Sequence, residues 1–180
     1  GGVHLEEAAE LRSIAFDKTG TLTIGRPRLV DFKPAIGFKA DEVLRLAASA
    51  ESLSEHPLSK AVVEAAKMRG MTLMPSSDFQ ALIGKGVRAR VQERLVWVGK
   101  PELFTARGLS IPPELADVQA DGGTTVYVGD EKAVAGILVL ADTMREGAEE
   151  AVAGLRALGL GPLVMLTGDS RKVAGAIAER

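Results

Sequence analysis

Two segments of the sequence place reactive polar side chains directly after short apolar runs. Asp17 follows the run 13–16, and the tripeptide Thr-Gly-Asp at 167–169 follows the run 162–166. In open α/β sheets, ligands bind at the carboxyl ends of the strands. We therefore expect the two segments to converge on one phosphate, where a carboxylate can act as a nucleophile and form an acyl phosphate.

The side chains around Asp17 suit phosphoryl transfer, which depends mainly on positioning and on neutralisation of charge. Lys18 supplies a positive charge, whereas Thr19 and Thr167 supply hydroxyl and backbone groups for phosphate oxygens. Mg²⁺ prefers oxygen ligands, and we expect Asp17 and Thr19 to be among them. The candidate catalytic residues are Asp17, Lys18, Thr19, Thr167, Gly168 and Asp169. An Asp and a Gly at a polar turn also occur without any function.

A second group of residues has the features of a ligand pocket. Pro57 is suited to the first turn of a helix. His56, one of two histidines, precedes it at a position where helices often bind ligands. The same residues also fit a plain helix start with a polar cap. Gly84 and Gly86 form a Gly-x-Gly, which taken alone is more often a turn than a ligand loop.

The composition limits the classes of protein to which the chain can belong. Its 180 residues suffice for one ordinary domain or two small ones, and 46 % of them are hydrophobic, which supports a buried core. The net charge is −2, and no basic block indicates nucleic acid binding. The absence of cysteine excludes disulfides, thiolate zinc sites and cysteine nucleophiles. We see neither a signal peptide nor an apolar run of the ~18 residues that a membrane helix needs.

The elements that must position these residues can be predicted from hydrophobic spacing. Buried strands at 13–16 and 162–166, with a helix at 145–158 before the second, have the order of a parallel α/β sheet. Between them we expect an α+β section that contains antiparallel hairpins. Its predicted elements are helices 41–50, 57–70 and 101–106 and hairpins 87–98 and 124–140. Further helices are predicted at 1–12 and 170–180.

This pattern predicts one α/β domain that is interrupted by an insertion. We place the first part of the α/β domain at 1–32, the inserted domain at 33–135 and the second part at 136–180. Asp142 follows the second boundary, where an Asp can cap the helix predicted from 145.

The segment that begins at Asp17, Asp-Lys-Thr-Gly-Thr-Leu-Thr, matches the phosphorylation motif of the P-type ATPases at every position. The resemblance implies a haloacid-dehalogenase-like, Rossmann-like phosphorylation domain and an aspartyl-phosphate at Asp17. Phosphatases of the wider superfamily carry a second Asp as general base where this chain has Thr19. A hydroxyl is a poor base, so we expect the phosphoenzyme to hydrolyse slowly on its own.

The pentapeptide at 54–58, Ser-Glu-His-Pro-Leu, resembles the nucleotide-domain signature of the heavy-metal-transporting (P1B-type) P-type ATPases. The resemblance implies that His56 orients ATP and that Glu51 contacts the adenine end. It also implies that the glycine backbone approaches the nucleotide closely. The nucleotide-binding candidates are Glu51, His56, Pro57, Gly84, Gly86 and Gly99. Lys100 departs from the Gly-Asn of copper pumps and is given no role.

The same resemblance implies ATP and Mg²⁺ as cofactors and a cytoplasmic position within an integral membrane pump of a prokaryotic plasma membrane. Its partners would be the membrane helices and actuator domain of that pump, with no nucleic acid and a monomeric fragment. Asp142 resembles a residue of the hinge where the chain re-enters the phosphorylation domain. The Gly-Asp-Gly-x-Asn-Asp loop of the family is absent, so we expect a truncated phosphorylation domain that binds nucleotide with little or no turnover.

Two other functions fit parts of the pattern. A soluble phosphatase of the dehalogenase-like superfamily is disfavoured by Thr19, and a non-enzymatic nucleotide-binding module would not need Asp17. Among pumps, the lead-in from Gly1 and the segment 99–104 favour zinc, cadmium or cobalt over copper as the transported ion.

Overall fold

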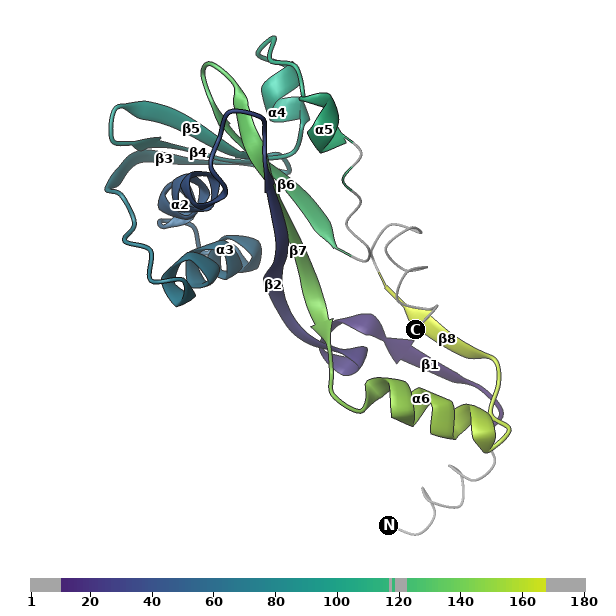
Figure 1. Ribbon diagram of the computed structural model, residues 1–180. Coiled ribbons are helices and arrows are strands. Elements are labelled where there is room, and N and C mark those ends of the chain that lie inside the picture. Colours follow the sequence, from purple (N-terminus) through teal and green to yellow (C-terminus); the bar gives the residue numbers. More distant parts are fainter. Residues whose placement is uncertain (1–10, 117, 119–122, 168–180) are drawn as a thin grey trace. The chain divides into compact units, whose positions relative to one another are not determined.

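The computed structural model describes residues 11–116, 118 and 123–167, and it divides into two compact units. Unit 1 comprises Gly1–Arg26 and Asp142–Arg180, and unit 2 comprises Pro27–Ala141. The chain passes from one unit to the other within strand β2 (Thr23–Pro34) and returns within strand β7 (Val134–Met144) (Figure 1). The predicted boundaries at 32/33 and 135/136 fall inside these same two strands.

Unit 2 is built on a six-stranded sheet with the order β2-β7-β6-β5-β4-β3. The remaining strands are β3 (Ser76–Leu82), β4 (Gly86–Val91), β5 (Arg94–Gly99) and β6 (Thr124–Asp130). The pairs β4–β5 and β6–β7 are antiparallel, which confirms both predicted hairpins. Helices α2 (Ala40–Glu51) and α3 (Pro57–Met68) pack together beside this sheet, as Figure 1 shows. Short helices α4 (Glu102–Thr105) and α5 (Pro113–Ala116) follow β5.

The sequence spacing explains how the helices and strands of unit 2 share their cores. Along β4, Val87, Ala89 and Val91 are buried and join a core with the apolar face of α2 and α3. The residues between them, Arg88 and Arg90, lie on the other side of the strand, as the two-residue period of a strand requires. A second core contains Trp97, Phe104, Leu115, Tyr127 and Ile137. The sheet of unit 2 therefore has apolar residues buried on both faces.

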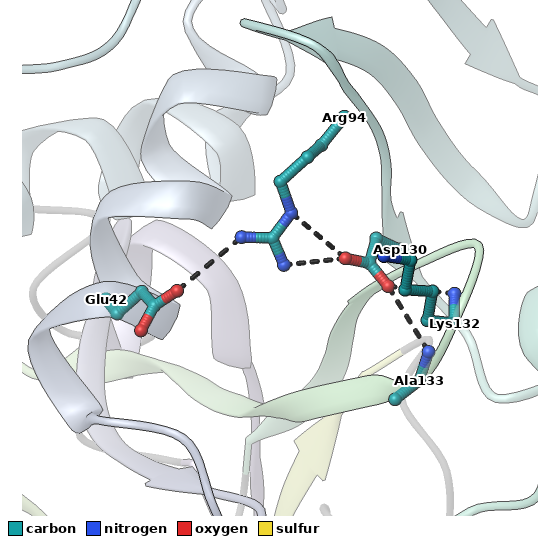
Figure 2. A network of polar contacts seen from close by, with 5 residues as sticks. All are labelled: Glu42, Arg94, Asp130, Lys132 and Ala133. Atoms are coloured by element: carbon teal, nitrogen blue, oxygen red, sulfur yellow. Dashed lines mark hydrogen bonds and ion pairs between the residues drawn. The ribbon is translucent and has the colours of Figure 1, made fainter.

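A polar network joins helix α2 to two turns of the sheet (Figure 2). Arg94 donates from Nη2 to Asp130 Oδ2 at 2.6 Å and from Nε to the same oxygen at 3.0 Å, and its Nη1 lies 3.5 Å from Glu42 Oε1. Asp130 Oδ1 accepts hydrogen bonds from the backbone N–H groups of Lys132 and Ala133. Burial alone would raise the pKa of Asp130, but these hydrogen bonds outweigh it and the pKa is lowered.

Three elements of unit 2 were not predicted, namely β2, β3 and α5. Strand β2 is at one edge of the sheet, contains Pro27 and Pro34, and is mostly exposed. Edge strands tolerate proline and lack a continuous apolar pattern, so this segment resembled a loop. Strand β3, at the other edge, is likewise only partly buried and carries a register irregularity between Ser77 and Gln80.

Unit 1 pairs strand β1 (Ile14–Asp17) in parallel with β8 (Leu163–Leu166), as predicted. Helix α6 (Ala148–Ala157) precedes β8. The expectation that both strands are buried is wrong: Ala15 and Asp17 are exposed, and Val164 and Leu166 are 45 % and 55 % exposed. In the described part of unit 1 these two strands form the whole sheet, so one side of each remains uncovered. The helices predicted at 1–12 and 170–180 lie outside the described residues, apart from positions 11 and 12.

No helix among the described residues is both long enough and apolar enough to span a membrane.

Candidate functional site

Asp17 is the last residue of β1 and its side chain is exposed. Its partner in the parallel strand β8 is Leu166, and Thr167 follows Leu166 directly. The structure therefore brings Asp17 and Thr167 together at the carboxyl ends of these two strands. Gly168 and Asp169 lie outside the described residues. The carboxylate of Asp17, at this end of the strands, can therefore be reached from solvent.

The loop after Asp17, Lys18–Leu22, is an irregular turn, because Thr19 (ψ 118°) and Gly20 (φ +81°) have non-helical backbone angles. Lys18 is 6 % exposed, whereas Thr19 is exposed. Thr23, which is fully buried, closes the turn: its Oγ1 lies 3.0 Å from the carbonyl oxygen of Lys18 and 3.4 Å from the N–H of Gly20. The backbone after Asp17 is therefore held by a side chain from within the same motif.

Asp142 and Arg145 attach the returning chain to this loop. Asp142 Oδ2 accepts a hydrogen bond from the Thr23 hydroxyl at 2.5 Å, and its Oδ1 accepts one from the N–H of Arg26 at 3.0 Å. Arg145 donates from its backbone N–H to the carbonyl of Leu22 at 2.8 Å and from its guanidinium to the loop carbonyls.

The interpretation of Asp142 as a helix cap is wrong, because it lies within β7 and the cap of α6 is Gly147. Gly147 has φ +78°, a left-handed conformation that side-chain-bearing residues rarely adopt. Because the chain turns at Gly147, helix α6 begins at Ala148 and not at the predicted position 145. Asp142 instead organises the loop beside Asp17.

A cavity of about 420 Å³ lies in unit 2 and gathers most of the predicted nucleotide-binding residues. It is lined by Glu51, His56, Gly84, Gly86 and Gly99, all of which were predicted from the sequence. Pro57 begins α3 and is not part of the lining. The apolar lining includes Leu58, Leu82, Ile83, Val87, Val98 and Val126. The cavity therefore combines apolar walls with a few polar groups, as is usual for sites that bind small molecules.

His56 caps helix α3 with its imidazole, whose Nδ1 accepts a hydrogen bond from the N–H of Leu58 at 3.2 Å. Pro57 occupies the first turn, where its missing N–H does no harm. Because Nδ1 is the acceptor, the neutral imidazole carries its proton on Nε2. The ring of His56 is exposed and can therefore donate to a ligand from Nε2.

Gly86 and Gly99 face each other across β4 and β5 and bring two backbones into close approach. A Cβ added to Gly86 would collide with the carbonyl oxygen of Val98 and would come within 2.6 Å of Gly99 Cα. The N–H of Lys100 donates to the carbonyl of Lys85 at 2.8 Å and completes this junction. The wall of the cavity at this point is therefore formed by the backbone of Gly86 and Gly99, with no room for a Cβ at either position.

Glu51 is the one carboxylate of the cavity lining among the described residues, and it is only 6 % exposed. Burial raises its pKa to about 7, and a hydrogen bond from Ser59 offsets part of that rise. Ser59 Oγ donates to Glu51 Oε2 at 2.6 Å.

The sequence interpretation missed several residues that organise the two sites. Ser59 follows His56 by one helical turn, which is the spacing that places two side chains on one face of a helix. Its position near His56 could therefore have been predicted from the sequence. Lys85 and Lys100 line the cavity beside the predicted glycines. Thr23 and Arg145 act through hydrogen bonds to distant segments, which no local pattern reveals. In the described part of the chain, no group of three or more acidic or histidine side chains could hold a metal ion.

Comparison with known proteins agrees with this arrangement. Residues 11–180 match the haloacid dehalogenase-like hydrolase family. Copper-transporting ATPase 1 of Rhizobium meliloti (strain 1021) is 42 % identical over 182 residues, covering 99 % of this chain and 22 % of that protein. The chain thus spans about a quarter of the curated relatives that it matches.

Two solved structures resemble the chain over 99 % of its length. A zinc-transporting PIB-type ATPase in the E2.Pi state has a TM-score of 0.81 and 36 % identity, and the match covers 29 % of it. The catalytic domain of the CPx-ATPase CopB-B, in a study of its conformational changes upon nucleotide binding, has a TM-score of 0.72 and 26 % identity, with 61 % covered. These matches confirm the resemblance inferred from the two motifs and the α/β fold with an antiparallel sheet. The chain belongs to the haloacid dehalogenase-like hydrolase family, and its relatives within that family are heavy-metal-transporting P-type ATPases.

Proposed function

We propose that the chain is the ATP-binding and autophosphorylating region of a P-type ATPase that exports a transition or heavy metal ion. The observation that carries the proposal is the place of Asp17: an exposed carboxylate at the carboxyl end of β1, beside Thr167 at the end of the parallel strand β8. The braced loop between Lys18 and Thr23 supports it, because phosphoryl transfer depends on exact positioning of the nucleophile.

In the proposed reaction, a carboxylate oxygen of Asp17 attacks the γ-phosphorus of ATP. A bond forms between that oxygen and phosphorus, and the bond from phosphorus to the β,γ-bridging oxygen breaks. ADP leaves with the electron pair, and Asp17 becomes an acyl phosphate. Lys18 contributes positive charge near the phosphate, and Thr19 supplies no base, so the acyl phosphate is expected to persist.

Asp17 and Thr19 would contribute oxygen ligands to Mg²⁺, as the chemistry of hard cations favours. The exposed carboxylate of Asp17 and the exposed Thr19 fit this role, since both can be reached from solvent. The bound cation would supply neutralisation of the phosphate charge.

For the nucleotide, we propose the cavity of unit 2 as the binding site. The His56 imidazole can donate to a phosphate or sugar oxygen, and the bare backbone at Gly84, Gly86 and Gly99 allows close approach. The apolar walls suit the faces of a nucleobase. A solved relative, the CopB-B catalytic domain, is described as changing conformation on nucleotide binding, which supports this assignment.

We further propose that the chain lies on the cytoplasmic side of a prokaryotic plasma membrane and acts with the membrane and actuator domains of its own pump. As a fragment we expect it to be monomeric. The names of the relatives include both copper and zinc as transported elements.

The test uses the parent pump for phosphorylation and the present chain for binding. With ATP labelled at the γ-phosphate, we expect acid-stable label on the wild-type pump and none on Asp17→Asn, whereas Asp31→Asn, an exposed Asp of β2, keeps the label. Label on Asp17→Asn would contradict the role of Asp17. Titration of ADP should show weaker binding to His56→Ala, and equal affinities would contradict the role of His56. Rapid release of phosphate from small phosphoesters would instead support a phosphatase.

A further inference from the structure

Two lysines meet at one end of the cavity in unit 2. Lys85 is the last residue of the turn between β3 and β4, and Lys100 directly follows β5. The N–H of Lys100 donates to the carbonyl oxygen of Lys85 at 2.8 Å, which extends the β4–β5 pairing by one residue beyond Gly86 and Gly99. The two lysines are therefore direct cross-strand neighbours.

Both lysines belong to the face of the sheet that forms the cavity wall. Residues two positions apart in a strand point to the same face. Lys100 lies two positions after Val98, and Lys85 lies two positions before Val87, and all four residues line the cavity. Because both lysines are exposed, their ammonium groups can contact a ligand that enters from solvent.

The positive charge of this pair is not compensated by any described side chain. Like charges directly opposite each other in an antiparallel pair destabilise the sheet. In the part of the chain that the structure describes, neither ammonium group takes part in an ion pair or a hydrogen bond. Glu51, the one carboxylate of the described lining, accepts its hydrogen bond from Ser59. A bound anion would therefore relieve the repulsion between the two lysines.

The remaining wall of the cavity is mostly apolar, with Leu58, Val98 and Val126 among its residues. A ligand that matches the whole cavity therefore has an apolar ring system and an anionic tail. A lysine binds phosphate as a point charge, so two adjacent lysines suit a chain of phosphate groups better than a single phosphate.

We propose that Lys85 and Lys100 form the subsite for the phosphate chain of the nucleotide, and that their charges make the cavity prefer nucleotides with more phosphate groups. The inference rests on the nucleotide-binding function proposed above. It assigns a role to Lys100, at the position where this chain departs from the Gly-Asn of copper pumps. A neutral amide can donate hydrogen bonds to phosphate but adds no charge, so a preference that depends on charge and on salt would come from the lysines.

The first test compares ADP with AMP, which differ by one phosphate group. Lys85→Gln, Lys100→Gln and the double Gln variant remove charge from this chain but keep polar side chains. We expect the wild-type chain to bind ADP more tightly than AMP, and each substitution to weaken ADP binding about fivefold, as is typical of an exposed pair of charges. Binding of AMP should weaken less, so the preference for ADP over AMP should fall. An unchanged preference in the double Gln variant, or an equal loss of affinity for both ligands, would overturn the proposal.

Ionic strength provides a second readout, which a purely structural role of the lysines would not change. Salt screens exposed charges, with a screening length of about 10 Å at 0.1 M. The Kd for ADP should therefore rise with NaCl concentration in the wild-type chain and rise less in the double Gln variant. Lys85→Arg combined with Lys100→Arg keeps both charges and should retain the salt dependence and the preference for ADP. Equal salt dependence in the wild-type chain and the double Gln variant would overturn the proposal.

Lys132→Gln is the matched control. Lys132 is an exposed lysine of the β6–β7 turn and is not part of the cavity lining, so its replacement should leave the Kd for ADP and the preference over AMP unchanged. A loss as large as that of the double Gln variant would show that the net charge of the protein is responsible, and would overturn the proposal. Urea unfolding followed by Trp97 fluorescence checks that every variant is folded.

The outcomes separate this inference from the function on which it rests. Absence of ADP binding to the wild-type chain at every salt concentration would contradict the proposed function itself. Binding of ADP that is equally tight in the wild-type chain and the double Gln variant would leave that function standing and would overturn the role of the two lysines.

Discussion

Arg145 donates from Nη2 to the carbonyl oxygen of Gly20 at 2.8 Å, although the two residues are 125 positions apart in the chain. Its Nε also donates to the carbonyl of Thr21 at 3.2 Å. One planar guanidinium thus holds two successive carbonyl groups of the loop that follows Asp17. The segment that returns to unit 1 therefore fixes the backbone next to the proposed nucleophile.

Replacing Arg145 should slow phosphorylation without affecting nucleotide binding. Arg145→Ala removes two hydrogen bonds from a charged donor, but the side chain is exposed, so we expect a loss of about 1 kcal/mol, or roughly fivefold in the phosphorylation rate. Arg145→Lys should restore little of the phosphorylation rate, because an ammonium group lacks the planar geometry with which a guanidinium donates two hydrogen bonds. The measurement is the initial rate of acid-stable labelling of the parent pump. An unchanged rate in Arg145→Ala, at equal ADP affinity, would contradict this.

A methyl group at Gly86 should damage the cavity, whereas one at Gly84 should not. Gly86 has φ +140°, and an added Cβ would collide with the Val98 carbonyl, so we expect Gly86→Ala to lower the unfolding free energy by about 2 kcal/mol or more. Gly84 has φ +69° but open space, so Gly84→Ala should cost about 1 kcal/mol through strain alone.

Urea unfolding followed by Trp97 fluorescence measures this difference. Trp97 is the only tryptophan and is buried in unit 2, so the signal reports that unit. Equal losses in the two variants would show that the close approach of the backbones at Gly86 does not constrain the fold.

The stability of unit 2 should fall as pH rises through neutrality, because of Glu51. Its pKa is raised from 4.5 to about 7 in the folded chain, so between these values the folded state binds more protons than the unfolded state. The resulting stability is complete below pH 4.5 and is lost as pH rises through about 7, to a total of about 3 kcal/mol. Glu51→Gln should remove this slope. Parallel pH profiles for the two proteins, from Trp97 unfolding curves, would be inconsistent with a buried neutral acid.

Asp130 should produce the opposite dependence at acidic pH. Its folded pKa is lowered below 3.8, so its contribution is present above pH 3.8 and is lost as pH falls through the folded value. Arg94 is partly exposed, with 41 % of its side chain accessible, so we expect only about 1 kcal/mol from the pair. Asp130→Asn should therefore destabilise unit 2 at pH 7 and have a smaller effect at pH 3. An effect of the same size at both pH values would exclude an ionic contribution.

The sequence predicts those parts of the molecule whose signal is local. The motif that begins at Asp17 and the pentapeptide at 54–58 are contiguous, so a family resemblance could be inferred from them without the fold. Helix α2 and the β4–β5 hairpin have strong periodicity and appear where it predicts them. Strand β2 lacks such a signal, because an edge strand needs neither burial nor continuous pairing.

The parts that could not be predicted depend on contacts between distant segments. Thr23 and Asp142 are 119 positions apart, and nothing in either neighbourhood indicates that they share a hydrogen bond. The raised pKa of Glu51 depends on burial by surrounding elements, which the position of the residue at a helix end does not reveal. Tertiary packing therefore determines both the raised pKa of Glu51 and the hydrogen bond between Thr23 and Asp142, and local sequence patterns reveal neither.

The entry and exit of unit 2 through neighbouring strands β2 and β7 affect how the chain folds. Ile14 pairs with Leu163, so β1 and β8 must close a loop of about 150 residues. If unit 2 folds first, its two ends are already adjacent, and only about 35 residues of that loop remain flexible. Because closure entropy grows with the logarithm of loop length, this lowers the cost of pairing β1 with β8 by about 1 kcal/mol. The inserted unit thus brings its two flanking segments together, so that β1 and β8, the strands of the proposed phosphorylation site, can pair last.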